Sequence, residues 1–217
     1  MLSLNLAQNT KTGLKILCLG SHSDDIEIGC GGTILRLLAE RQKVDITWVV
    51  LASTADRERE ARNSAAQFLS RADKKNVVIN NFRDGFFPFD GAQIKNYFEQ
   101  EIKPISPDVV FTHSRKDAHQ DHRLVAELTW NTFRNHLILE YEIPKYDGDM
   151  GQPNFFVPLD REMCENKVDY LMEAFGTQRP KAWFAKETFL GLMRLRGMEC
   201  VAPSGYAEAF YCRKVVI

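Results

Sequence analysis

Short apolar runs alternate with amphipathic stretches along the chain. Leu14 to Leu19 and Val44 to Ala52 are continuous apolar runs with the length and composition of buried parallel strands. Between such runs, apolar residues recur at helical spacing, bounded by capping residues, glycine or proline. The pattern predicts strands at 14–19, 44–52, 76–80, 108–113, 137–141, 155–159 and 206–216, and helices at 29–40, 57–69, 92–102, 161–175 and 187–196. A further helix is expected after Asp117, a capping residue type.

The order of these elements predicts the fold class. Strand and helix alternate four times from residue 14 onward, which favours an α/β fold with a Rossmann-like, doubly wound, mostly parallel sheet flanked by helices. The 217 residues suit a single domain spanning 1–217, with residues 1–13 as a loose N-terminal arm. Right-handed crossovers would bring the carboxyl ends of the first and fourth strands to one edge, where such sheets bind ligands.

Imidazoles and carboxylates are concentrated at these two strand ends. The residues concerned are His22, Asp24, Asp25, His113, His119, Asp121 and His122. A solvated turn or a helix cap could explain any one of them, but these segments hold four of the chain's five histidines. Two adjacent carboxylates are costly to bury without a partner, and a divalent metal would remove that cost while using the imidazoles. The pattern therefore indicates a metal site.

The two segments also resemble a known family. SHSDDIEIGCGGTI and HSRKDAHQDHRLV are similar to the two signatures of the PIG-L/LmbE-type zinc-dependent N-acetylglucosaminyl deacetylases. The order and spacing of the motifs, an Arg-Asp-Gly turn and a late Tyr-Ala-Glu-Ala-Phe extend the resemblance. Ser23 and Ile26 replace the usual proline and glutamate, at positions that do not bind the metal in the family. Residues 135–205 offer no comparable match, so they do not indicate a substrate.

The resemblance implies a role for each motif residue. It implies three ligands for Zn²⁺, namely His22, Asp25 and His122. A site with nitrogen and oxygen ligands also accepts Fe²⁺, Mn²⁺ or Co²⁺. Asp24 would be the general base, beside the metal but not bound to it. His119 would stabilise the oxyanion or protonate the leaving amine, with Asp121 orienting the His119 ring.

Substrate contacts are indicated more weakly. Arg57 and Arg59 begin a helix where the family has a substrate-binding arginine, although the sequence REREAR also suits a solvated helix face. Asp84 matches a position that hydrogen-bonds sugar hydroxyls, although a turn aspartate before Gly85 is an equal alternative. The implied reaction removes an N-acetyl or similar N-acyl group from an amino sugar or sugar conjugate. Because these positions favour a sugar only weakly, a non-sugar acyl amide remains the alternative substrate.

Two alternatives from other classes receive less support. Gly29-Cys30-Gly31-Gly32 raises the possibility of a nucleotide-binding Rossmann module. That fingerprint needs its first glycine at the strand end, whereas here Ser21 to Ile28 intervene. A protein that binds zinc only for stability would not need Asp24 beside its ligands.

Charge and cysteine content limit the classes of binding partner and the cellular compartment that we expect. The net charge of −1 gives no basic field for nucleic acid, and no apolar run has membrane-spanning length. We therefore expect a small N-acetylated sugar or conjugate as partner, without nucleic acid or membrane, and leave a homo-oligomer open. Five widely spaced cysteines lack a Cys-x-x-Cys pair, and the first thirteen residues lack a signal-peptide pattern. These features favour reduced thiols and a cytoplasmic location.

Overall fold

One seven-stranded sheet organises the described residues. The structure is a computed structural model that describes residues 13–41 and 43–216, so the expected N-terminal arm lies outside the described residues except for Gly13. The strands are β1 (Leu14–Gly20), β2 (Val44–Val50), β3 (Lys74–Ile79), β4 (Val109–His113), β5 (Leu137–Tyr141), β6 (Phe155–Leu159) and β7 (Tyr206–Cys212). Their order is β3-β2-β1-β4-β5-β7-β6, with β1 to β5 parallel and β7 antiparallel to β5 and β6. The expected α/β, mostly parallel sheet is confirmed.

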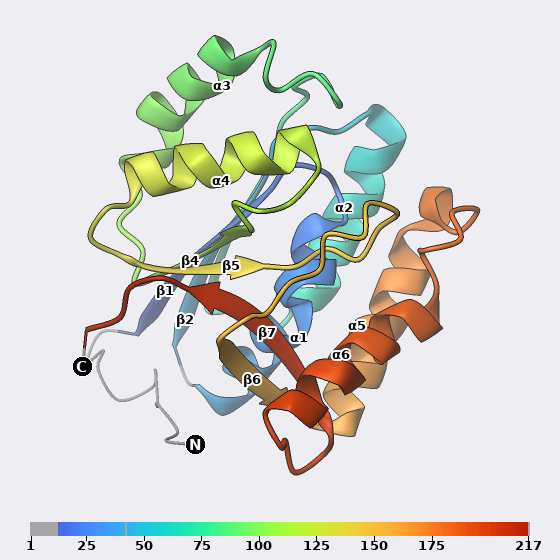
Figure 1. Cartoon of the computed structure of the whole chain (residues 1–217). Coiled ribbons are helices and arrows are strands. Elements are labelled where there is room, and N and C mark those ends of the chain that lie inside the picture. Colours follow the sequence, from blue (N-terminus) through green and yellow to red (C-terminus); the bar gives the residue numbers. More distant parts are fainter. Residues whose placement is uncertain (1–12, 42, 217) are drawn as a thin grey trace.

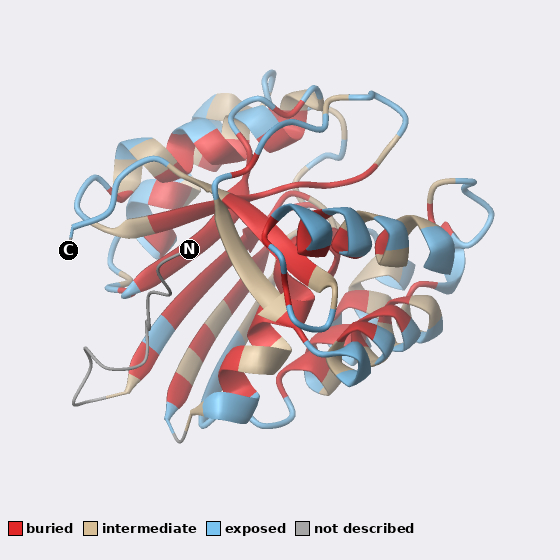
Figure 2. Ribbon diagram, turned by 60° about the horizontal axis from the view of Figure 1, so that its bottom comes forward, coloured by how far each residue is buried: buried red, intermediate tan, exposed pale blue. Residues whose placement is uncertain are grey.

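Helices cover both faces of the sheet (Figure 1). One layer contains α1 (Asp25–Glu40), α2 (Ala55–Phe68), α5 (Arg161–Ala174) and α6 (Lys186–Glu199). The opposite layer contains α3 (Gly91–Tyr97), the π-helix η1 (Phe98–Ile102) and α4 (Gln120–Thr132). Short η2 (Gly176–Gln178) links α5 to α6. Alternate strand residues fill the two cores, as with Trp48 in the first and Val49 in the second. Figure 2 shows this burial along the strands and on the inward helix faces.

The direction in which successive strands are added to the sheet reverses beside β1, which makes this place a topological switch point. The chain passes from β1 to β2 and β3 on one side, and then returns to form β4 on the other. Ile16 pairs with Val109 and Cys18 with Phe111, so β1 and β4 run parallel and end at the same edge. Ligands of open α/β sheets bind in the crevice at such a point.

The glycine-rich segment lies inside α1, so the helix begins at Asp25 rather than at the expected residue 29. A Cβ atom on Gly29 would overlap the Tyr141 ring, and one on Gly32 would crowd Leu159 and Glu208. These glycines therefore allow close packing within a helix and form no phosphate-binding loop. The nucleotide-binding alternative loses the sequence feature that suggested it.

Glu208 on β7 joins the end of the chain to this first helix. Its carboxylate accepts hydrogen bonds from the backbone N–H groups of Gly32 (2.8 Å) and Thr33 (2.7 Å). Lys167 on α5 completes the cluster, because its Nζ lies 2.6 Å from Glu208 Oε1 and also 2.6 Å from the Ile28 carbonyl. All of these side chains are buried. The ion pair between Lys167 of α5 and Glu208 of β7 thus binds the backbone in the middle of α1 and stabilises it there.

Other boundaries differ from expectation for local reasons. The helix expected at 92–102 changes at Phe98 into a π-helix, in which Lys103 N–H donates to the Phe98 carbonyl at 2.8 Å. The helix expected after Asp117 begins at Gln120, because His119 rather than Asp117 is its N-cap. The last strand ends at Cys212, where the ladder to β5 ends.

Candidate active site

The two sequence motifs meet at the carboxyl ends of β1 and β4. Gly20 ends β1, and the following turn leads to Asp24 at the N-cap of α1 and Asp25 in its first turn. His113 is the last residue of β4, and a short loop leads to His119 at the N-cap of α4. The parallel pairing of β1 with β4 is therefore what brings residues about a hundred positions apart together.

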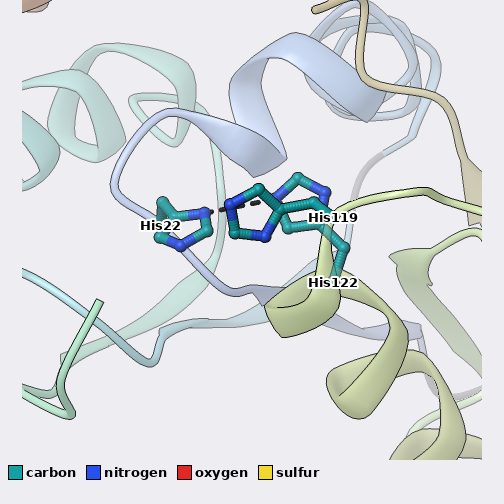
Figure 3. A group of neighbouring side chains, drawn as sticks. All are labelled: His22, His119 and His122. Atoms are coloured by element: carbon teal, nitrogen blue, oxygen red, sulfur yellow. Dashed lines mark hydrogen bonds between the residues drawn. The ribbon is translucent and has the colours of Figure 1, made fainter. Parts of the chain in front are cut away.

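Three side chains present ligand atoms to one point. His22 Nδ1 lies 3.1 Å from His122 Nε2, and the two oxygens of Asp25 lie close to these rings, with Oδ2 3.4 Å from His22 Nδ1 and Oδ1 3.5 Å from His122 Nε2. Ligand atoms bound about 2.0–2.1 Å from a tetrahedral zinc ion are about 3.3–3.5 Å apart. Figure 3 shows the His22 ring facing His122, with His119 beside them. The spacing of these three donors thus fits a divalent ion.

Carboxylates on the far side of each ring set the tautomers. His122 Nδ1 lies 2.9 Å from Asp117 Oδ2, and His22 Nε2 lies 3.3 Å from Asp121 Oδ2 and 3.0 Å from Asp84 Oδ1. These carboxylates favour a proton on His122 Nδ1 and on His22 Nε2, so in the neutral rings that a bound metal would require, the lone pairs would lie on His122 Nε2 and His22 Nδ1. Both lone pairs belong to the atoms that face Asp25, as metal ligation requires.

Electrostatics at the ligands favour a positive charge. Burial alone would raise the pKa of Asp25, but the imidazoles of His122 and His113 outweigh burial and hold that pKa well below its usual range. Burial and the neighbouring His113 lower the pKa of His122 to about 4, so this ring is neutral. Burial also acts to lower the pKa of His22, yet the Asp25 and Asp121 carboxylates raise it well above its usual value. The site therefore holds an ionised Asp25 beside the imidazoles of His122 and His22, and this arrangement can bind a proton or a metal cation.

Asp24 has one anchored and one open carboxylate oxygen. Its Oδ1 accepts a hydrogen bond of 2.7 Å from Arg57. Its Oδ2 is buried and has no hydrogen-bond partner among residues 13–41 and 43–216. Burial raises the pKa of Asp24, and the Arg57 guanidinium partly offsets this rise. A buried, open oxygen of raised basicity is what a proton acceptor needs.

His119 faces the same space as the ligands. Its Nδ1 accepts a hydrogen bond of 3.3 Å from the backbone N–H of Asp121, so the other ring nitrogen carries the proton in the neutral ring. One ring nitrogen of His119 lies within 4.8 Å of ligand atoms of His22 and His122. Burial and the nearby His22 lower the pKa of His119. The neutral ring can therefore donate a hydrogen bond into the site.

The Asp121 carboxylate, expected to orient the His119 ring, contacts other groups in the structure. The Asp121 carboxylate accepts backbone hydrogen bonds from Gly85 (2.7 Å) and Phe87 (3.2 Å), and it faces the His22 ring instead. Residues two positions apart at a helix start point to different sides, so the two side chains diverge. Asp121 therefore orients the predicted ligand His22, and it connects that ring to the turn around Gly85.

The predicted substrate residues separate into two groups. Arg57 lies at the site, with its guanidinium bound to Asp24. Arg59 does not, and this expectation requires correction: its side chain is 72% exposed and pairs with Asp56 at 3.2 Å, because residues two apart on a helix face different sides. Asp84 lies beside the site, with a side chain that is 75% exposed and an oxygen (Oδ1) 3.0 Å from His22 Nε2.

Several residues at the site had no assigned role from the sequence. Asp117 was recognised only as a capping type, although a ligand histidine usually has a carboxylate partner, and this rule could have identified it. Lys145 and Asp149 come from the loop after β5, where no sequence pattern indicated a role. His113 is fully buried, stacks on His122 with 3.9 Å between ring centroids, and lies 3.2 Å from Asp25.

Comparison with known proteins gives the family. The profile of PIG-L, described as GlcNAc-PI de-N-acetylase, matches residues 17–133, which is more than half of the chain and includes both motifs. The chain belongs to the PIG-L family. An uncharacterized deacetylase of this kind, YaiS from Escherichia coli (strain K12), is 32% identical over 142 residues, which cover 59% of this chain and 74% of YaiS.

Solved structures share the fold of this PIG-L chain. The N,N'-diacetylchitobiose deacetylase from Pyrococcus horikoshii superposes with a TM-score of 0.70 at 19% identity, covering 96% of this chain and 86% of that protein. GalB from Pseudomonas putida KT2440, a 4-carboxy-2-hydroxymuconate hydratase, has a TM-score of 0.73 at 16% identity, covering 94% and 98%. A deacetylase and a hydratase share this fold, so the reaction must be argued from the site.

Two expectations about context can be compared with the structure. All five cysteines are free thiols, in agreement with the sequence interpretation. Across residues 13–41 and 43–216, none of the helices combines the length and apolar character needed to cross a membrane. The cytoplasmic location, the single-domain boundaries and the oligomeric state stay predictions.

Proposed function

We propose that the protein is a metal-dependent hydrolase that removes an N-acetyl or similar N-acyl group from an amino sugar or sugar conjugate. Membership of the PIG-L deacetylase family supports the reaction class. The observation that carries the proposal for this chain is the open oxygen of Asp24 beside converging donor atoms of His22, Asp25 and His122. A site used only for stability would not need a buried carboxylate oxygen without a partner.

The metal would be held by His22 Nδ1, the Asp25 carboxylate and His122 Nε2, with zinc as the expected ion. A divalent ion there would lower the pKa of the attacking water and polarise the substrate carbonyl. Iron, manganese or cobalt would suit the same donor set. Three protein ligands leave room for water and substrate, as in catalytic rather than structural sites.

The side chains around these ligands divide the proton transfers. Asp24 Oδ2 accepts the proton of the attacking water, while Arg57 holds Oδ1 and keeps the carboxylate oriented. In its neutral form His119 donates a hydrogen bond from its protonated ring nitrogen to the developing oxyanion. The lowered pKa of His119 favours this neutral form at neutral pH, so delivery of a proton from His119 to the leaving amine would first require uptake of a second proton by the ring.

Substrate selection is proposed for residues at the opening. Asp84 is exposed and could bind a sugar hydroxyl while its other contact, to His22, holds it in place. Arg57 would influence the substrate mainly through Asp24, because that carboxylate already occupies its guanidinium. A sugar is favoured over a simple amide because Asp84, although one of its oxygens contacts His22, is largely exposed beside the site; a non-sugar acyl amide remains the second substrate class.

The test is acetate release by the metal-loaded protein. The protein is stripped with a chelator and reloaded with one equivalent of Zn²⁺, Mn²⁺, Fe²⁺ or Co²⁺. It is then assayed on N-acetylglucosamine, N,N'-diacetylchitobiose, N-acetyl amino acids and simple acetamides. We expect acetate from at least one N-acetylated sugar, and none from the stripped protein.

The same assay separates the alternatives. Acetate from the amides alone would move the substrate class away from sugars. Hydration of a 2-hydroxymuconate without acetate from any amide would instead place the chemistry with that of GalB. A Asp24→Asn variant that retains its metal serves as the control for background hydrolysis.

A further inference from the structure

A half-buried lysine from the loop after β5 lies behind the predicted ligand His122. The Lys145 side chain is only 9% exposed, and its Nζ lies 3.0 Å from Asp117 Oδ1 and 2.5 Å from Asp149 Oδ2. The other oxygen of Asp117 lies 2.9 Å from His122 Nδ1. Lys145, Asp117 and His122 thus form a continuous chain of charged and polar contacts that ends at the metal site.

Asp117 depends on its surroundings to remain a fixed anion. Its side chain is 3% exposed, and Oδ1 accepts a hydrogen bond from the backbone N–H of His119 (2.8 Å) and forms an ion pair with Lys145 Nζ (3.0 Å). A buried carboxylate needs a countercharge and complete hydrogen bonding to stay ionised in one orientation. Lys145 supplies the charge on Oδ1, which leaves Oδ2 directed at His122.

The same lysine fastens a loop to the site. Asp149 Oδ2, which pairs with Lys145, also accepts the backbone N–H of Ala118 at 2.6 Å. Ala118 lies directly between Asp117 and His119, so loop 142–154 is tied to the segment that carries the site. Loop 142–154 has no sequence signature of its own. These contacts show that two of its charged residues, Lys145 and Asp149, both attach the loop to the segment that carries the site.

We propose that Lys145 is a positioning residue of the metal centre. Acting through Asp117, it holds His122 in the tautomer and orientation in which Nε2 binds the metal. The inference rests on the proposed function in taking His122 as a metal ligand, and it adds a residue that lies two contacts away from that ligand. A partner in such an outer position typically changes metal affinity or activity by about 10–100-fold.

The experiment measures metal affinity rather than activity. Apo protein and Lys145→Met are titrated with Zn²⁺ and Co²⁺ against a chromophoric chelator, and the visible absorption of the Co²⁺ forms is recorded. We expect Lys145→Met to bind both ions about 10-fold more weakly, with a changed Co²⁺ band. Lys186→Met is the matched control, because Lys186 pairs with Asp169 on the exposed surface at 2.5 Å. Wild-type affinity and an unchanged band in Lys145→Met would overturn the proposal.

A second variant separates positioning from simple charge balance. Removing Lys145 leaves the buried Asp117 carboxylate beside the half-buried Asp149 carboxylate, whose repulsion could disturb the loop. Lys145→Met combined with Asp149→Asn relieves this repulsion and keeps an acceptor for Ala118, so it should fold even if the single variant does not. We expect its thermal stability to recover while metal binding stays weak. Recovery of wild-type metal affinity would show that Lys145 only neutralises Asp149.

These readouts keep the two proposals distinguishable. A wild-type protein that binds metal but releases no acetate would overturn the proposed function while leaving the role of Lys145 measurable. Acetate release with an unchanged metal affinity in Lys145→Met would overturn the positioning role alone. A double-mutant cycle with Asp117→Asn completes the test, because Lys145→Met should add little loss once the carboxylate it acts through is gone.

Discussion

Asp24 and Asp25 are neighbours in sequence with opposite environments. Asp25 is surrounded by imidazoles that hold its pKa well below the usual range despite its burial, whereas burial raises the pKa of Asp24. Carboxyl groups whose environments separate their pKa values commonly divide the roles of charge stabiliser and proton acceptor. Each aspartate of the motif can therefore be tested for a different function.

Asp24→Asn should retain the metal and lose turnover. Asparagine keeps the size of the side chain and can accept from Arg57, but it cannot take a proton at neutral pH. We expect a drop of about 10²–10⁴-fold in turnover, the usual contribution of a positioned base. Metal content and initial rate are measured together on the same preparation. Near-normal turnover with full metal would remove Asp24 from the mechanism.

Asp121→Asn should act on the metal, because the Asp121 carboxylate faces His22. The amide cannot support the His22 N–H as an anion does, and its NH₂ group would oppose the backbone donors of Gly85 and Phe87. We expect metal affinity to fall by about 10-fold, measured by chelator competition. A double-mutant cycle with His119→Ala should be additive. Strong non-additivity, with metal affinity unchanged, would restore the pairing with His119 that the sequence suggested.

Helix α1 shows how much of the fold the sequence could predict. Apolar runs located the central parallel strands β1, β2, β4 and β5, because such strands are buried on both faces and their pattern is local. The start of α1 was placed four residues late because glycines oppose helix formation in isolation, and only tertiary contacts with Tyr141 and Glu208 explain them. The π-helical turn at Phe98 likewise has no local signal.

Gly29→Ala should destabilise the protein through these contacts. The added methyl group would meet the Tyr141 ring, whose hydroxyl donates to the Leu19 carbonyl at 2.6 Å in the buried core below the site. Overpacking of this kind typically costs about 1–3 kcal/mol. Gly191→Ala in α6 is the control, because its Cβ would meet nothing within 4 Å and alanine favours a helix by about 0.5–1 kcal/mol. Chemical denaturation should give opposite signs for the two; equal effects would contradict the packing argument.

At the scale of the whole molecule, the sequence predicted which residues lie together at the site but not which side chains contact one another there. Parallel pairing of β1 with β4 follows from element order, so the meeting of both motifs was predictable. The carboxylates that contact each histidine ring could not be predicted, because these contacts depend on side-chain directions and on loops far away in the sequence. Lys145 reaches Asp117 from a segment without regular structure, and Asp121 contacts a turn more than thirty residues away in sequence.

Metal removal should lower the stability of the whole protein. An ion that binds only the folded chain stabilises it by about 2.7 kcal/mol when its free concentration is about 100 times the Kd. For a chain of this size, that corresponds to a rise of about 5–10 °C in Tm. Thermal melts with and without a chelator measure the difference. His22→Ala, Asp25→Ala and His122→Ala should each abolish the metal-dependent difference in Tm. A full metal-dependent difference in all three variants would show that the ligand set is wrong.

The brace between Glu208 and the middle of α1 also affects how the chain folds during synthesis. Gly32 and Glu208 are separated by 176 positions, so the helix that carries Asp25 lacks this support until β7 has been synthesised. Contacts of such long range form late and slowly, because a large loop must close before they contribute. The nascent chain therefore carries its first motif for more than 170 residues of synthesis before β7 can stabilise the helix.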